Sequence, residues 1–191
     1  YNNPNKIPTV IIRYDTSKDI ESKQGITGTD KEQLHSNTMI DILYNNINYV
    51  PKEYKKILPK FKNMANNKFN IISSQFSIHY YFENMSMLES YLENISNNCK
   101  SGGYFIGTCY DGSKVFNLLN RINKLEYIDE LNNVVYYIEK DYTIDNFDYN
   151  PKDTSNMLGK QIKVYMDSIG KEITEYLVNF DFMIDIMKKY G

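Results

Sequence analysis

The first half of the chain alternates between short β-branched runs and helical segments, and this order restricts the fold more than any other feature. Strand-like runs occupy residues 9–14, 69–74 and 104–108, with helical patterns between them at residues 31–46 and 86–95. A repeated strand–helix–strand order favours a parallel sheet with crossover helices on its faces. The sequence therefore predicts an α/β fold whose strands are buried, as is typical of parallel sheets.

The second half predicts a different kind of sheet. Residues 134–138 and 162–166 alternate between apolar and polar side chains, which indicates exposed antiparallel strands. Helices are predicted over residues 115–125 and 183–189, a strand over residues 174–180, and an acidic loop over residues 141–156. Ser86, followed three residues later by Glu89, predicts a capping box at the start of the helix over residues 86–95.

Residues 16–68 predict a polar and lysine-rich insertion within a single domain that spans residues 1–191. The part at residues 52–68 carries six lysines and one glutamate. Two interpretations remain open for this lysine run: the solvated face of a helix, or a surface that faces RNA.

Composition excludes several classes of protein. The net charge is −2, so the chain lacks the overall basic character of many nucleic-acid-binding domains. No apolar stretch approaches the roughly 18–20 residues that a membrane span requires. Cys99 and Cys109 form no CxxC pair, and neither His35 nor His79 has zinc-ligand spacing to a cysteine. The sequence also lacks a P-loop, an HExxH motif and a GxSxG nucleophile elbow.

Ligands of parallel α/β sheets bind beyond the carboxyl ends of the strands. Three such ends carry polar side chains: Asp15, residues 75–81 and residues 108–111. Asp15 is either a turn-capping residue or a carboxylate that accepts hydrogen bonds from a nucleotide. The aromatic and polar side chains of residues 75–81 form either a half-buried aromatic cluster or a site for a flat heterocycle. Glu175, alone in a strand-like run, is most simply a solvated strand residue.

Residues 69–82, FNIISSQFSIHYYF, closely resemble the signature of mRNA cap (guanine-N7) methyltransferases. Three further segments resemble the same family in the same order: YDTSK at 14–18, SGGYFIGTCYDG at 101–112 and EYLVNF at 175–180. The resemblance covers the chain from about residue 9 to its end. The motifs and the insertion are most similar to those of the capping enzymes of large DNA viruses.

The resemblance implies a class I (Rossmann-like) methyltransferase fold and transfer of a methyl group from S-adenosylmethionine to N7 of the cap guanine. It implies cofactor binding by Asp15 and Gln75. It also implies that the capped mRNA 5′ end (GpppN) binds to a second group of residues: Phe76, Ser77, His79, Tyr80, Tyr110 and Glu175. Tyr110 stands where cellular members often have proline. No catalytic base is expected, because guanine N7 carries no proton.

The family's glycine-rich cofactor motif and its ribose-binding acid are absent from this sequence. We therefore expect the chain to be the central and later part of a methyltransferase domain, truncated at both ends and nearly inactive alone. The resemblance implies an intracellular protein, with triphosphatase and guanylyltransferase domains in the same polypeptide or a stimulatory subunit as partners. Two alternatives remain: a catalytically inactive methyltransferase-like subunit of a capping complex, and a single-stranded RNA binder.

Overall fold

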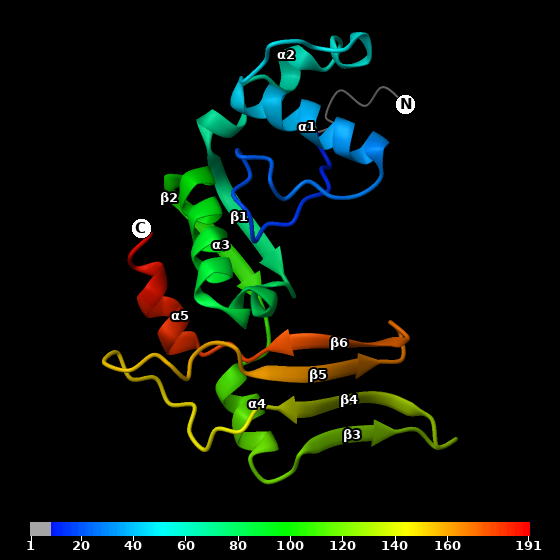
Figure 1. The fold of residues 1–191 in the computed structure, drawn as a ribbon, viewed down its shortest axis with the longest axis vertical. Coiled ribbons are helices and arrows are strands. Elements are labelled where there is room, and N and C mark those ends of the chain that lie inside the picture. The colour runs from blue at the N-terminus through cyan, green and yellow to red at the C-terminus, as the bar shows by residue number, and fades with distance from the viewer. Residues whose placement is uncertain (1–8) are drawn as a thin grey trace. The chain divides into compact units, whose positions relative to one another are not determined.

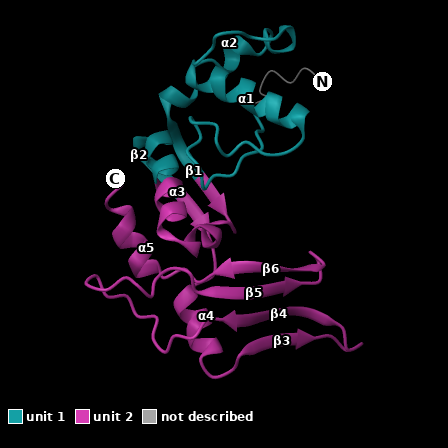
Figure 2. Ribbon diagram, viewed as in Figure 1, with its two compact units in different colours: residues 1–72, 93–105 teal, residues 73–92, 106–191 magenta. Residues whose placement is uncertain are grey.

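The computed structural model describes residues 9–191, so the first eight residues of the predicted domain lie outside the described residues. It divides into two compact units, shown in Figure 2. Unit 1 comprises residues 1–72 and 93–105, and unit 2 comprises residues 73–92 and 106–191. Both units draw on separate stretches of the chain, because the strands of one sheet pass from unit 1 into unit 2.

Unit 1 is organised around α1 (Asp30–Tyr44), which begins where Thr29 and Glu32 form a capping box. Buried Met39 and Ile42 on this helix pack with Phe61, and the following segment contributes further apolar side chains to the same cluster. That segment contains three short helices: η1 (Lys52–Tyr54), α2 (Leu58–Phe61) and η2 (Ala65–Asn67). The helix predicted over residues 31–46 is therefore confirmed.

The strand predicted over residues 9–14 is wrong. Tyr14 makes an isolated antiparallel bridge to Ile26, and the residues before it are not in a strand. The backbone N–H of Arg13 instead donates to the hydroxyl of Ser36 on α1, at 3.1 Å. Val10 and Ile12 pack against the apolar cluster of α1. The β-branched run is therefore extended chain that covers a helix, and it is not a strand of a sheet. Asp15 consequently does not stand at a strand end.

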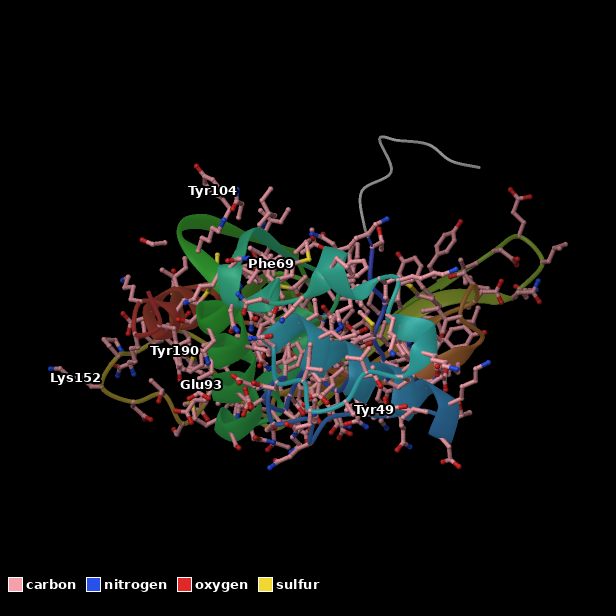
Figure 3. All side chains as sticks on the ribbon, turned by 90° about the horizontal axis from the view of Figure 1, so that it is seen from above. Tyr49, Phe69, Glu93, Tyr104, Lys152 and Tyr190 are labelled. Carbon is pink, nitrogen blue, oxygen red and sulfur yellow. The ribbon has the colours of Figure 1, made fainter. Side chains whose placement is uncertain are left out.

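The other two strands of the first half are confirmed, as β1 (Phe69–Gln75) and β2 (Cys99–Thr108). They form a two-stranded sheet and run in the same direction, joined by α3 (Met85–Asn98), as Figure 1 shows. The predicted burial of these strands is wrong in the part described: Phe69, Ile71 and Tyr104 are at least one-third exposed. Figure 3 labels Phe69 and Tyr104.

The start of α3 also differs from the prediction. The helix begins at Met85, and the side chain of Asn84 accepts a hydrogen bond from the backbone N–H of Met87, at 3.0 Å. Asn84 therefore caps the helix in place of the predicted Ser86, which already lies in its first turn.

In unit 2 an antiparallel sheet has the order β3–β4–β5–β6 (Figure 1). Its strands are β3 (Lys124–Ile128), β4 (Val134–Asp141), β5 (Gln161–Met166) and β6 (Lys171–Tyr176). The predicted antiparallel strands at residues 134–138 and 162–166 are confirmed as β4 and β5, which pair directly. Strand β3 was not predicted, because its Leu125 also fits a helical apolar pattern.

Two helices complete unit 2: α4 (Gly112–Leu119) and α5 (Phe180–Met187). The predicted helix over residues 115–125 begins earlier, because the Asp111 carboxylate caps it, and it ends before β3. The two remaining predicted elements are present but shifted along the chain. Strand β6 begins three residues before the strand predicted over residues 174–180. Helix α5 begins three residues before the helix predicted over residues 183–189. Within residues 9–191 no helix is long and apolar enough to cross a bilayer.

Candidate functional site

The site is built where the carboxyl end of β1 leads into the 3₁₀ turn η3 (Ile78–Glu83), which packs against β6 within unit 2. Seven of the eight predicted site residues belong to this unit: Gln75, Phe76, Ser77, His79, Tyr80, Tyr110 and Glu175. The eighth, Asp15, belongs to unit 1, where its carboxylate accepts a hydrogen bond from the backbone N–H of Ser17, at 3.0 Å.

Glu175 and His79 are the central pair. Nε2 of His79 lies 3.5 Å from Oε1 of Glu175. His79 is 3% exposed and Glu175 is 7% exposed. Glu175 lies opposite the buried Ile162 in the β5–β6 pairing, so register turns its carboxylate toward the covered face of the sheet. The interpretation of Glu175 as a solvated strand residue is therefore wrong.

Burial disfavours the charged form of both members of this pair. It raises the pKa of Glu175 to about 7 and lowers the pKa of His79 to about 4, because a charged form loses its hydration inside the protein. Although 3.5 Å is within reach of an ion pair, His79 is uncharged near neutral pH, and the contact is not a salt bridge under those conditions.

The pair also retains unused hydrogen-bonding capacity. Within the described residues, both ring nitrogens of His79 and Oε2 of Glu175 are buried and have no hydrogen-bond partner. An unsatisfied buried polar group costs about 1–3 kcal/mol, so native proteins keep few of them. Buried donors and acceptors that remain unpaired are therefore a sign of a site that binds a polar ligand.

Aromatic rings flank His79. Tyr80 meets its ring edge-on, with centroids 4.3 Å apart, and the ring of Tyr110 is inclined to it by 28°, with centroids 6.4 Å apart. Tyr80 and Tyr110 are one-third exposed and half-buried, respectively, and burial is the main cause that raises the pKa of both phenols. The ring arrangement suits a flat heterocycle, which gains from both stacking and edge contacts.

The carboxyl end of β1 is hydrogen-bonded to the neighbouring strand β2. The hydroxyl of Thr108, the last residue of β2, donates to Oε1 of Gln75 at 2.8 Å. The backbone N–H of Phe76 donates to the carbonyl oxygen of Thr108, at 2.9 Å. Phe76 has a φ of +50° and its side chain remains 68% exposed. These contacts fix Gln75 and present Phe76 at the surface.

Sequence reasoning placed Thr108 at a strand end expected to face a ligand but gave it no individual role, and it singled out no role for Ser74. Ser74 shares a hydrogen bond with Ser77, 2.8 Å between the hydroxyl oxygens, which ties Ser77 to the end of β1. The sequence signal that could have identified them is a hydroxyl residue at the carboxyl end of each of two neighbouring parallel strands. Within the described chain no cluster of three or more His, Cys, Asp or Glu residues could hold a metal ion.

Gly112, two residues after Tyr110, contacts the segment that follows the strand with Glu175. Its backbone N–H donates to the carbonyl oxygen of Val178 at 2.9 Å, and a Cβ atom at this position would lie 2.5 Å from the Val178 backbone. The start of α4 and the segment after β6 are therefore in direct backbone contact.

Comparison with known proteins connects this arrangement to a family. Residues 26–191 match the mRNA (guanine-N(7))-methyltransferase domain. A probable mRNA-capping enzyme of Acanthamoeba polyphaga mimivirus is 31% identical over 148 residues, which cover 73% of this chain and 12% of that protein. The mRNA cap guanine-N(7) methyltransferases of Saccharomyces cerevisiae and Drosophila melanogaster are each 27% identical, over 64% of this chain and 28% and 26% of their own lengths.

The chain thus spans less than a third of each of these relatives. The family match nevertheless covers most of its 191 residues, including the turn with His79 and the strand with Glu175. The chain belongs to the mRNA (guanine-N(7))-methyltransferase domain family, with the mixed α/β structure that a class I methyltransferase fold requires.

Proposed function

We propose that this chain binds the guanine of a capped mRNA 5′ end (GpppN) and takes part in methyl transfer from S-adenosylmethionine to guanine N7. The observation that carries the proposal is the buried pair His79 and Glu175: both ring nitrogens of His79 and Oε2 of Glu175 lack hydrogen-bond partners within the described residues. The alternative of a catalytically inactive partner subunit is not favoured, because the relatives bear the names of the enzymes themselves.

Glu175 supplies the specificity for guanine in this proposal. Guanine presents its N1–H and its N2 amino group side by side, and one carboxylate accepts a hydrogen bond from each. Adenine lacks this pair of donors on its Watson–Crick edge. The Oε2 atom of Glu175 is buried, has no hydrogen-bond partner among residues 9–191, and is available to such a ligand.

His79 acts as a neutral donor rather than as a catalytic base. Its lowered pKa of about 4 keeps the imidazole uncharged at neutral pH, with one N–H to donate. A donor at this position suits guanine O6, which lies beside N1 on the same edge of the base. Tyr80 and Tyr110, whose rings contact His79, supply the stacking surface.

The carboxyl end of β1 suits the methyl donor. The Gln75 amide is exposed, and hydrogen bonds to Thr108 and Ser73 fix its orientation but leave a second N–H for a ligand. Gln75 would hold one polar edge of S-adenosylmethionine, which supplies an electrophilic methyl group on sulfur. Asp15 remains the predicted partner of its adenine.

Positioning and electrostatics account for the proposed catalysis. The lone pair of guanine N7 attacks the methyl carbon without prior loss of a proton, so the residues need only hold the reacting atoms in line. Positive charge develops on the guanine ring during transfer. The Glu175 carboxylate, fixed at the edge of that ring in a region with little water, stabilises this charge.

Equilibrium binding of GpppA and ApppA tests the proposal. We expect the chain to prefer GpppA, and Glu175→Ala to lower its affinity for GpppA about 10- to 100-fold, since hydrogen bonds to charged groups contribute about 1.5–3 kcal/mol. Glu172→Ala is the matched control: Glu172 lies on the same strand but opposite Tyr165, on the other face of the sheet. Equal affinity for GpppA and ApppA in a folded chain would overturn the proposal.

A further inference from the structure

A second charged surface lies in unit 1, on residues 49–68, which we call the lysine segment. Its six lysines are all exposed, and Glu53 is its only acidic residue. Within residues 9–191 none of these lysines forms an ion pair. The lysines are Lys52, Lys55, Lys56, Lys60, Lys62 and Lys68.

The lysines face outward because the apolar side chains between them are used in packing. Tyr54, Ile57, Leu58, Phe61 and Met64 recur at spacings of one or three residues and pack with the apolar cluster of α1. The lysine segment is therefore held against a helix by its apolar side chains, while its six lysines stay exposed to solvent.

Two polar contacts fix the lysine segment further. The hydroxyl of Tyr54 and Nδ1 of His35 lie 3.0 Å apart, and the backbone N–H of Asn63 donates to the carbonyl oxygen of Ile42 at 3.0 Å. Both connections run to residues of α1. A charged array on a fixed backbone loses less conformational entropy when it binds than charges on a free chain would lose.

An exposed aromatic residue adjoins this array. Tyr49, labelled in Figure 3, is 79% exposed and lies three residues before Lys52. Basic side chains that contact phosphates, combined with an aromatic ring on which a base stacks, are the usual elements of single-stranded nucleic-acid binding.

The charge balance of the whole chain makes this local surface informative. A net charge of −2 gives no general attraction for a polyanion, so any such affinity must come from a local concentration of positive charge. An acidic protein surface is the competing partner. Protein interfaces usually have an apolar centre, whereas the apolar side chains of the lysine segment are used in packing on α1.

We propose that the lysine segment binds single-stranded RNA, with its lysines on phosphate groups and Tyr49 stacked on a base. This inference rests on the proposed function, in which capped RNA is the substrate, and it assigns the RNA chain a second binding surface. The contact is independent of nucleotide sequence, because phosphates carry no sequence information.

Binding of an uncapped RNA of about 12 nucleotides, measured at several salt concentrations, tests this proposal. The test variant combines Lys52→Gln, Lys55→Gln, Lys56→Gln and Lys60→Gln. The control variant makes the same change of charge at four exposed lysines elsewhere: Lys31, Lys100, Lys152 and Lys189. We expect the test variant to bind at least about tenfold more weakly at low salt and to lose about 0.7 of the log–log salt slope per lost phosphate contact.

Tyr49→Ala separates stacking from charge. We expect it to weaken RNA binding about tenfold without altering the salt slope, while Tyr49→Phe retains the affinity. Equal losses in the two four-lysine variants, or no binding of RNA by the unmodified chain, would overturn the proposal. Binding of poly-glutamate as tight as that of RNA would assign the surface to an acidic protein instead.

The two proposals fail separately. The dinucleotide GpppA is read by Glu175, so the four-lysine variant should bind it normally, and Glu175→Ala should bind uncapped RNA normally. Loss of RNA binding with retained preference for GpppA would leave the cap site standing, and the reverse result would leave the lysine segment standing.

Discussion

The imidazole of His79 and the carboxylate of Glu175 face each other across 3.5 Å, although one lies on the 3₁₀ turn η3 and the other on strand β6. Burial disfavours the charged form of each residue, as the pKa values of about 4 and about 7 indicate. The ionisation of Glu175 should therefore be coupled both to ligand binding and to folding.

Cap binding should weaken as the pH falls below 7. Only the carboxylate form of Glu175 accepts both guanine hydrogen bonds, and its pKa of about 7 means that the protonated form dominates at pH 6. We expect the affinity for GpppA to fall up to tenfold per pH unit below 7 and to level off above about pH 8. Isothermal titration calorimetry in buffers of different ionisation enthalpy should also detect proton release on binding near pH 7.

Glu175→Gln provides the control for this pH dependence. The variant cannot ionise, so its weaker affinity should be constant between pH 6 and 8. A variant that kept the pH dependence of the unmodified chain would show that another group titrates, and the role of Glu175 would be refuted.

Glu175→Gln should also stabilise the fold at high pH. The folded state raises the pKa of Glu175 from 4.5 to about 7, so between these values it binds more protons than the unfolded state. The free energy of unfolding consequently falls as pH rises through this window. His79 acts in the opposite direction between pH 4 and 6.5, where its stabilising contribution is lost as pH falls.

Comparison of Glu175→Gln with the unmodified chain cancels the His79 contribution. We expect the advantage of the variant to be small at pH 5 and to reach about 1–3 kcal/mol at pH 8, measured by urea unfolding. An advantage that did not grow between these two pH values would contradict the raised pKa of Glu175.

Phe76→Gly should separate stability from binding. Phe76 adopts a left-handed φ of +50° that costs a residue with a Cβ about 1–2 kcal/mol, and its ring is 68% exposed. We expect the melting temperature to stay constant or rise, while GpppA binds about tenfold more weakly because a stacking surface is lost. Phe76→Tyr should keep the affinity; a glycine variant that bound GpppA normally would remove Phe76 from the site.

Asn84→Ala should destabilise the chain by about 1 kcal/mol, because the Asn84 side chain caps α3 at the backbone N–H of Met87. Ser86→Ala, the change at the cap predicted from sequence, should alter the melting temperature little. Thermal unfolding of the two variants measures the difference directly, and a larger loss in Ser86→Ala would restore the predicted capping box.

The strands β1 and β2 could be predicted because both contain runs of β-branched and aromatic residues. The start of β2 was misplaced, because Gly102 and Gly103 lie within the strand rather than before it. The same logic failed at residues 9–14. A β-branched run shows that a segment is extended and partly buried, but not whether its backbone pairs with a strand or, as Arg13 does, with a serine side chain on a helix. Strand β3 was missed because its first residues, Lys124 and Leu125, also continue the helical apolar pattern of residues 115–125.

The candidate site was predicted mainly through family resemblance. Residue pattern alone left Glu175 as a solvated strand residue, because strand register, which decides the face on which its side chain lies, depends on pairing with β5. The link between Gln75 and Thr108 depends likewise on the pairing of β1 with β2, which no local pattern records.

The close backbone contact of Gly112 with Val178 brings together the two segments that carry Tyr110 and Glu175 of the proposed guanine site. Tyr110 stands two residues before this glycine, and Glu175 three residues before Val178, whose backbone the glycine touches. Any side chain at position 112 would clash with the Val178 backbone, push these two segments apart and displace Tyr110 relative to Glu175. The choice between a purine and a smaller base can therefore change through a residue that never meets the ligand.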